Sequence, residues 1–142
     1  WRAGLLNSYM KKINKELKAI KPKLIVSMAP SVYPFSLNEY LQDWPTWVDS
    51  GWVDLILPQV YRYDINAYSA TLSQQKAYLK NNTSICYPGV LLKSGTYLPD
   101  DLFLTQMLQQ NRNQGFKGEC FFFYDGLKDK LSFFQNQYAF IK

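Results

Sequence analysis

Polar side chains suited to binding a hydroxylated ligand gather at the end of an apolar stretch in the middle of the chain. Residues 53–60 form a near-continuous apolar run, which is typical of a parallel strand covered on both faces. The polar residues at its end are Gln59, Tyr61, Arg62, Tyr63 and Asp64. An amide and a phenol exchange hydrogen bonds with hydroxyl groups, and a further tyrosine can stack on a sugar ring. Because barrel enzymes present their chemistry at polar strand ends, this cluster is a candidate substrate-binding site.

Gln59 and Tyr61 are the strongest candidates in this cluster, because they alternate with Leu55 and Leu57 and therefore share one face of the strand. In a barrel, the lower part of that face would pack in the core and its upper part would meet a ligand. A wall of tyrosines packed under loops accounts for the same residues structurally, since aromatic side chains make up 17% of the chain. Both interpretations stay open at this point.

Carboxylates are the remaining side chains for catalysis, because a chain without histidine builds neither an imidazole-based triad nor a His-ligated zinc site. Of the eleven Asp and Glu residues, only Asp64 and Asp125 follow the ends of expected strands. Two carboxylates that converge on a sugar act as acid and nucleophile, but Asp is also an ordinary turn residue. We therefore assign no catalytic residue. Asp64, Asp125 and Ser27, which marks the same level of the first strand, remain substrate-binding candidates.

Composition and charge narrow the classes of partner. The net charge of +5 comes largely from six lysines on or just after the first expected helix, which form a solvated face: Lys11, Lys12, Lys15, Lys18, Lys21 and Lys23. No basic run interleaves with aromatic residues as in a nucleic-acid groove, and no apolar segment has membrane length. Cys86 and Cys120 are interpreted as buried apolar side chains. We expect no cofactor, metal, nucleic-acid partner or transmembrane segment in this chain.

The elements that would position these residues alternate regularly. Hydrophobic periodicity predicts helices over residues 3–21, 36–51, 67–79, 100–114 and 128–141, and strands over 24–28, 53–61, 84–91 and 119–124. Strand starts roughly 30 residues apart are the spacing of βαβ units with parallel strands. The fold class is therefore α/β, and four such units make half of a (β/α)8 TIM barrel or a small open sheet.

Several local signals refine this pattern. Ser36 and Glu39 have the spacing of a capping box at a helix start, and Pro45 is placed to interrupt or restart that helix. Gly115 is expected to end a later helix in the left-handed conformation. Gly89, late in the third strand, either lets a ligand approach the backbone or marks a bulge.

The first residues of the chain suggest that it is a piece of a larger protein. It opens at Trp1 without an initiator methionine, directly in a helical pattern. A complete barrel has about 250 residues, so we interpret residues 1–142 as one piece of a larger protein, the C-terminal half of a barrel.

Motifs spread over nearly the whole chain resemble a known family, the bacterial glycosyl-hydrolase-like family ten. The resemblance rests on Trp1-Arg2, Lys21-Pro22, Ser27-Met-Ala-Pro30, Asp43-Trp44-Pro45, Pro58-Gln59-Val60-Tyr61, Gly89 and Gly115-Phe-Lys-Gly118, and it is densest over residues 41–61. It implies a glycoside hydrolase barrel on exported or envelope proteins, some of which act on peptidoglycan glycan strands. The four strands would be the fifth to eighth, and the principal catalytic carboxylate would lie on the strand before them. Arg62 and Leu92 depart from the family pattern on the substrate side.

Two functions follow as competing expectations. The first is a glycoside hydrolase acting on a bacterial polysaccharide, with this piece supplying substrate-binding walls and being inactive by itself. The second is a non-catalytic carbohydrate-binding module derived from such a barrel. An acidic pair at the end of the preceding strand would favour the enzyme, and its absence the module.

Overall fold

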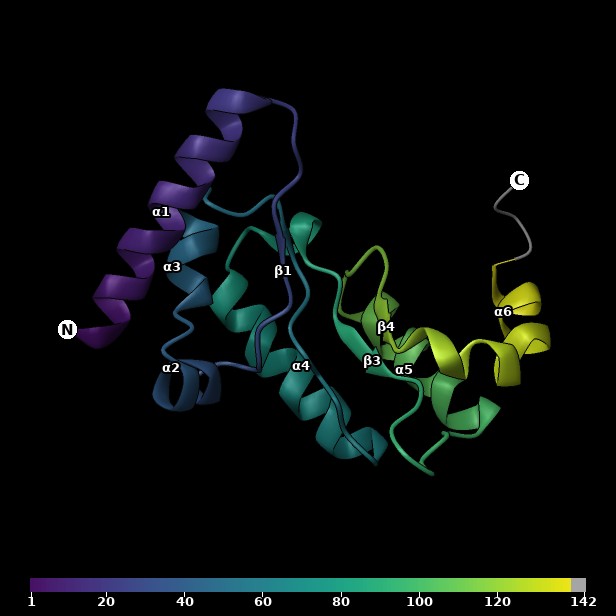
Figure 1. Cartoon of the computed structure of the whole chain (residues 1–142). Coiled ribbons are helices and arrows are strands. Elements are labelled where there is room, and N and C mark those ends of the chain that lie inside the picture. Colours follow the sequence, from purple (N-terminus) through teal and green to yellow (C-terminus); the bar gives the residue numbers. More distant parts are fainter. Residues whose placement is uncertain (139–142) are drawn as a thin grey trace.

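The computed structural model describes residues 1–138 and has four short parallel strands flanked by helices. The strands are β1 (Ser27–Met28), β2 (Leu55–Ile56), β3 (Gly89–Leu91) and β4 (Cys120–Phe122). β1 pairs with β2 and β3 pairs with β4, both in parallel register. A parallel bridge between Ile56 and Cys86 joins the two pairs, so the strands follow one another in chain order (Figure 1). Successive βαβ units produce this order, and the predicted α/β class is confirmed.

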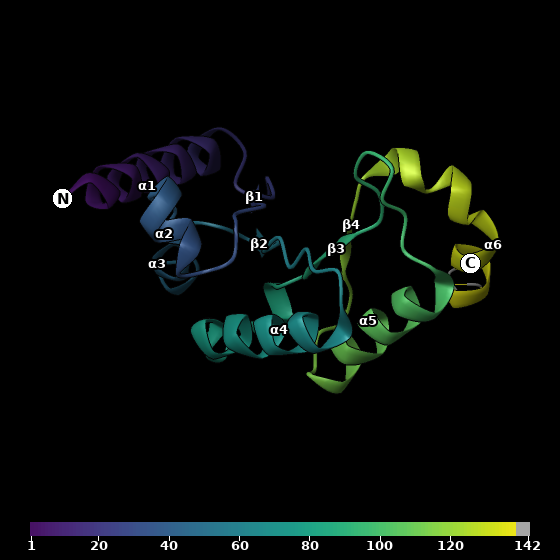
Figure 2. The same cartoon turned by 90° about the horizontal axis from the view of Figure 1, so that it is seen from below.

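Helices precede the first strand, connect the successive strands and follow the last one. They are α1 (Arg2–Ile20), α2 (Phe35–Tyr40), α3 (Trp44–Asp49), α4 (Ile65–Leu79), α5 (Asp101–Asn113) and α6 (Leu131–Gln137). Figure 2 shows α4 and α5 next to each other along one side of the strands, and the two helices are in contact. The predicted alternation is confirmed. The last expected helix begins as a 3-10 turn at Lys128–Lys130, and its final residues lie outside the described part of the chain.

The hydrophobic core lies between the strands and the helices. Val26, Ile56, Cys86 and Val90 contribute the strand side, each at most 8% exposed. The helices and the segments next to them contribute larger buried side chains, among them Trp44, Trp47, Tyr68, Leu72, Leu79, Leu104 and Met107. Each such side chain contributes about 1.5–3 kcal/mol through burial, so this layer fixes where the strand ends lie.

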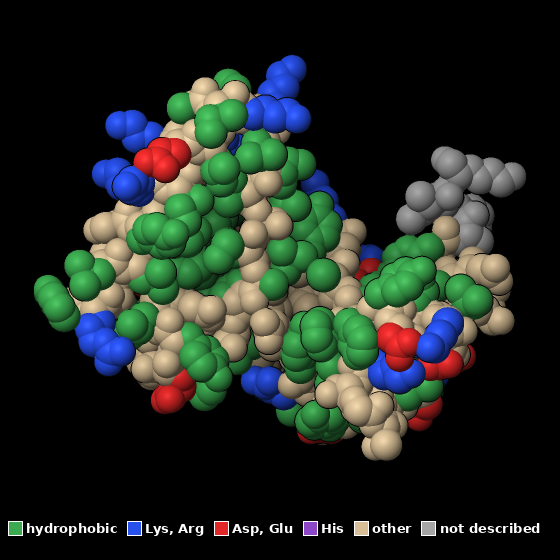
Figure 3. Space-filling view, viewed as in Figure 1, with side chains coloured by type: hydrophobic (Ala, Val, Ile, Leu, Met, Phe, Trp, Pro, Cys, Tyr) green, Lys and Arg blue, Asp and Glu red, His purple; other side chains and the backbone are tan. Residues whose placement is uncertain are grey.

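The other face of the strands is open. Ile25 beside β1 is 65% exposed and Phe122 on β4 is 48% exposed. The expectation that the apolar strands are covered on both faces is therefore not met within the described residues. Cys86 is buried as predicted, but Cys120 is exposed because it lies on the open face of β4. Figure 3 shows hydrophobic side chains gathered over this region of the surface.

The paired strands are shorter than predicted because prolines interrupt the hydrogen-bond ladder. Pro58 follows β2 closely and Pro88 directly precedes β3, and neither has an N–H to donate. The chain nevertheless stays paired beyond β2, since Gly89 N donates to Pro58 O (2.8 Å) and Gln59 N donates to Pro30 O (2.9 Å). The start of the expected strand 84–91 is a 3-10 turn at Thr83–Ile85.

The predicted capping box at Ser36 and Glu39 is wrong. α2 already begins at Phe35, so Ser36 lies inside the helix and its hydroxyl donates to Gln42 O (3.0 Å). Leu41, in the left-handed conformation at φ 62°, ends α2 and separates it from α3. The expected helix 36–51 is therefore two helices, and Pro45 lies in the first turn of the second, which confirms its predicted role.

Local features define both ends of α5, and the left-handed glycine after it is as predicted. The side chain of Asp100 accepts a hydrogen bond from Phe103 N (2.7 Å) and caps the helix start. Gly115 adopts φ 87° just after the helix, a conformation that favours glycine.

Candidate functional site

A pocket of about 390 Å³ lies beyond the C-terminal ends of β1 and β2. It is lined by Ser31, Val32, Phe35, Gln59, Tyr61 and Arg62. The first three residues follow β1 and the last three follow β2, so the parallel pairing of the two strands brings them together. In parallel α/β folds this edge is where ligands bind. None of the six residues lining it is acidic.

Gln59 links the ends of the two strands and still has an acceptor to offer. Its side-chain amide donates to Ala29 O (2.8 Å), which fixes the rotamer across the gap between β2 and β1. Its side-chain carbonyl oxygen has no hydrogen-bond partner among the described residues. An amide held in this way presents one preorganised acceptor to a ligand.

Tyr61 is held by packing on its ring. The ring stacks on Phe122 at a centroid distance of 5.5 Å and also lies against Gly89, where an added Cβ would come within 3.1 Å of it. That Cβ would also lie 2.9 Å from Pro58 O. Glycine is therefore required at position 89 by the close approach of the segment after β2, rather than by a ligand or a bulge. Burial, with a smaller effect of Cys120, raises the pKa of Tyr61 to about 12. Tyr61 therefore keeps its proton at neutral pH and can donate it in a hydrogen bond.

Arg62 brings a cation to the pocket. Its Nε donates to Thr71 Oγ1 in α4 (3.0 Å), and one terminal nitrogen donates to Tyr61 O (2.8 Å). Both partners are neutral, so the charge is not cancelled by these contacts.

Asp125 lies outside this pocket and is engaged in ion pairs. Its carboxylate contacts Lys128 Nζ at 2.5 Å and Lys93 Nζ at 2.8 Å. Lys93 also contacts Asp129 at 3.1 Å, so the group ties the chain after β4 to the end of β3. Hydrogen bonds from Lys128 and then Lys93 lower the pKa of Asp125 to about 2. At neutral pH Asp125 is ionised and cannot donate a proton.

The remaining candidates also lie apart from the pocket lining. The side chain of Asp64 caps α4 by accepting from Ala67 N (2.8 Å), which is a structural role. Tyr63 is 69% exposed and packs edge-on against Tyr97 at 4.8 Å. Ser27 is exposed on β1, below the pocket. The structure thus brings Gln59 and Tyr61 together, whereas Ser27, Tyr63, Asp64 and Asp125 stay separate from them.

Three lining residues were not predicted from the sequence: Ser31, Val32 and Phe35. They follow β1 as Gln59 and Tyr61 follow β2, so extending the strand-end rule past Pro30 would have found them. The Ser31 hydroxyl makes no hydrogen bond among the described residues, while its N–H donates to the Gln42 side chain (3.2 Å).

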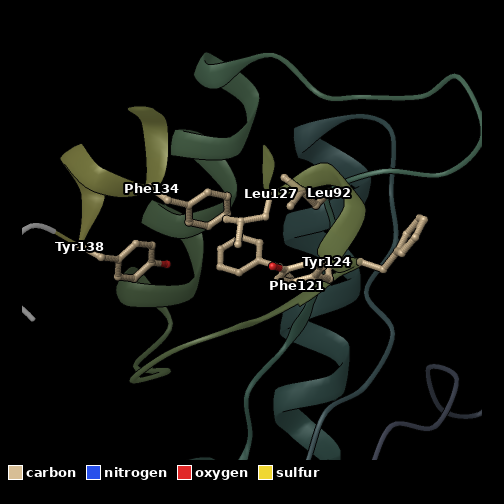
Figure 4. A pocket seen from close by; sticks show the side chains of 7 residues that line it. Leu92, Phe121, Tyr124, Leu127, Phe134 and Tyr138 are labelled. Carbon is tan, nitrogen blue, oxygen red and sulfur yellow. The ribbon is translucent and has the colours of Figure 1, made fainter. Parts of the chain in front are cut away.

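A second pocket, of about 460 Å³, lies between β4 and α6 and differs in character. It is lined by Leu92, Phe121, Phe123, Tyr124, Leu127, Phe134 and Tyr138. Figure 4 shows Phe121, Leu127 and Phe134 turned toward one another, and the two phenylalanine rings meet edge-on at 4.7 Å. An almost entirely apolar lining has few groups for hydroxyls, so the pocket at β1 and β2 is the better site for a hydroxylated ligand.

Comparison with known proteins identifies the family of the chain. The model of the glycosyl hydrolase-like 10 family matches residues 1–96, and the chain belongs to this family. The matched region contains all six residues that line the pocket. No curated protein and no solved structure gave a significant match.

Residues 1–138 offer neither a metal site nor a membrane-spanning helix. No group of three or more His, Cys, Asp or Glu side chains lies close enough together there to hold a metal ion. The described helices include none that is both long and apolar enough to cross a membrane.

Proposed function

We propose that this chain is part of a glycoside hydrolase that acts on a bacterial polysaccharide, and that the pocket at β1 and β2 binds the glycan. The observation that carries the proposal is a set of unused hydrogen-bonding groups at one strand end. Within residues 1–138, the Ser31 hydroxyl, the Gln59 side-chain oxygen and the Tyr61 hydroxyl lack protein partners. Sugar hydroxyls both donate and accept, and so fit such a set.

The barrel is part of this proposal. Four parallel strands in chain order, covered by helices on one face, support an assignment as the fifth to eighth strands of a glycosidase barrel. The open face with Ile25 and Phe122 would then belong to the barrel interior. In this assignment residues 1–142 are the C-terminal half of the catalytic domain.

Catalysis is assigned to carboxylates outside this piece. Glycoside hydrolysis normally needs two positioned carboxylates, and the two candidates at strand ends are engaged elsewhere, Asp64 as a cap and Asp125 in ion pairs. We therefore propose that the chain binds glycan but does not cleave it by itself. By the resemblance to its family, peptidoglycan glycan strands are the proposed substrate and the cell envelope or exterior the proposed location.

A non-catalytic carbohydrate-binding module is the second candidate. It is favoured by the absence of any acidic side chain in the pocket lining. Both candidates require glycan binding, and they differ in whether the full-length protein turns the glycan over.

Replacing Gln59 with alanine tests the binding role that both candidates share. We expect Gln59→Ala to weaken glycan binding by about 1–3 kcal/mol, because a ligand hydroxyl would lose its partner. The variant also loses the exposed bond to Ala29 O, which costs only about 0.5–1.5 kcal/mol of folding stability. Calorimetric titration with glycan oligomers and thermal melts measure the two effects. Gln135→Ala, on the exposed side of α6, is the matched control. Unchanged glycan affinity with a large loss of stability would make Gln59 a structural amide only.

A further inference from the structure

We propose that Arg62 makes this pocket selective for glycans that carry a carboxylate group on the sugar. The inference rests on the proposed glycan binding and deepens it by naming the substrate class. Arg62 is the only charged residue among the six that line the pocket.

The guanidinium of Arg62 is fixed but not neutralised. Thr71 Oγ1 and Tyr61 O hold two of its five N–H groups at 3.0 and 2.8 Å, and both acceptors are uncharged. Within residues 1–138, no carboxylate lies within 4.0 Å of it. The nearest acid along the chain, Asp64, directs its carboxylate to the start of α4. Three N–H groups are thus left for a ligand.

Arg112 shows what the same side chain does when it has a structural partner. Its two terminal nitrogens meet the carboxylate oxygens of Glu119 at 2.8 and 3.0 Å, in the paired geometry that guanidinium and carboxylate favour. Arg62 is half-buried and has no such partner within the described chain. Burying a cation without a counter-charge costs free energy. A ligand carboxylate would supply the counter-charge that Arg62 lacks.

The geometry also favours a sugar acid over a free anion. The unused groups of Ser31, Gln59 and Tyr61 line the same pocket and are neutral, so they suit hydroxyls rather than further negative charge. A pyranose ring carrying one carboxylate presents both kinds of group at once. The fork of N–H groups on arginine binds a planar carboxylate with defined orientation, which a lysine would not do.

A matched pair of oligosaccharides tests the inference on the 142-residue chain. The probes are β-1,4-linked glucose and glucuronic acid hexamers, which differ only in the carboxylate at C6. We expect the acidic hexamer to bind at least tenfold more tightly, Arg62→Gln to remove that preference, and Arg62→Lys to restore it only in part. Thr71→Val keeps the charge but removes the group that orients Nε, so it should reduce the preference even if Arg62→Gln folds poorly.

Arg2→Gln is the matched control, because it removes the same charge from an exposed position on α1 and should keep the preference. It separates pocket binding from general attraction of a polyanion to a chain of net charge +5. Equal binding of the two hexamers by the unaltered chain would overturn the inference and leave the proposed glycan binding intact. An equal loss of preference in Arg2→Gln and Arg62→Gln would also overturn it. Failure to bind either hexamer would overturn this inference, whereas the proposed glycan binding is tested separately by the calorimetric titration with glycan oligomers.

Discussion

At the scale of single residues, the pocket depends on side chains whose contacts leave part of their bonding capacity free. Gln59 uses its amide N–H on Ala29 O and keeps its oxygen, while Tyr61 is held by its ring and keeps its hydroxyl. Asp64 and Asp125 instead have structural contacts, a helix cap for Asp64 and ion pairs for Asp125. Residues that follow strand ends are therefore of two kinds. Those with a free polar group can bind a ligand, and those whose side chains are bound within the protein have a structural role.

Acid titration of Asp125 is the first prediction at this scale. Its ionised form is stabilised by Lys128 and Lys93, so we expect a midpoint of about 2 in the folded protein, below the ordinary aspartate pKa of about 3.9. A lowered pKa stabilises the fold above the unfolded pKa, and this contribution disappears as pH falls from about 4 through 2. Carboxyl chemical shifts measured by NMR report the midpoint directly.

Replacement by Asn supplies the check on that titration. Asp125→Asn should be less stable than the unaltered chain at pH 7, and the difference between them should shrink toward pH 2. A midpoint near 4, or a stability difference that does not depend on pH, would mean that the ion pairs with Lys93 and Lys128 do not hold in solution.

These residues differ in how far sequence could predict them. Gln59 and Tyr61 were predictable because they lie on one strand, where alternation sets the face. The contact of Asp125 with Lys93 and the contact of Arg62 with Thr71 join different elements. Such contacts depend on the packing of whole elements, which local patterns do not specify.

At the scale of elements, Glu119 anchors the start of β4 to α5. Its side chain is 2% exposed and is bound by both terminal nitrogens of Arg112, by Asn111 at 3.3 Å and by the hydroxyl of Tyr138. Asn111 in turn accepts from the hydroxyl of Tyr68 in α4 at 2.8 Å. This network lies at the end of β4 opposite the strand tips, so its role is to hold β4 against the helices.

Glu119→Gln is expected to destabilise the fold by about 1–3 kcal/mol, because the variant leaves Arg112 without its counter-charge. Arg112 is 39% exposed and can partly regain water, which keeps the loss below that of a fully buried pair. Urea unfolding at pH 7 measures the change. Glu39→Gln is the control and should stay within about 0.5 kcal/mol, since Glu39 is exposed and makes no cap. A large effect of Glu39→Gln would instead support the capping box at Ser36 and Glu39.

The elements themselves were largely predictable, and their boundaries were not. Apolar periodicity predicts the helices and the alternation because it reflects which face is buried. The failure at Ser36 has a physical cause, since Pro34 and the bond from Ser36 N to Val32 O start the helix before the serine. The strands were overestimated because an apolar extended segment remains extended where proline removes its pairing.

At the scale of the whole molecule, one side of the strand layer is buried and the other is open. Ile25 and Phe122 expose apolar surface there, and the free edges of β1 and β4 carry unpaired backbone groups. We expect the 142-residue chain to self-associate reversibly with rising concentration.

Light scattering coupled to size-exclusion chromatography measures this association, and Ile25→Lys should weaken it. Leu102→Lys is the matched control, because Leu102 is also exposed but lies on α5, one of the helices that cover the other side of the strands (Figure 2). A monomer at all concentrations with a sharp cooperative melt would show that the open face needs no cover.

The most direct test of the central claim is an amide NMR titration of the isotope-labelled chain with a glycan oligomer. The account predicts that the largest shift changes fall on the Gln59 side-chain amide and on the backbone amides of Ser31, Val32, Tyr61 and Arg62, the residues that line the pocket at β1 and β2. Changes centred instead on Phe121, Leu127 and Phe134 would place the ligand in the apolar pocket beside α6 and contradict the account. An unchanged spectrum at saturating oligomer would contradict glycan binding altogether.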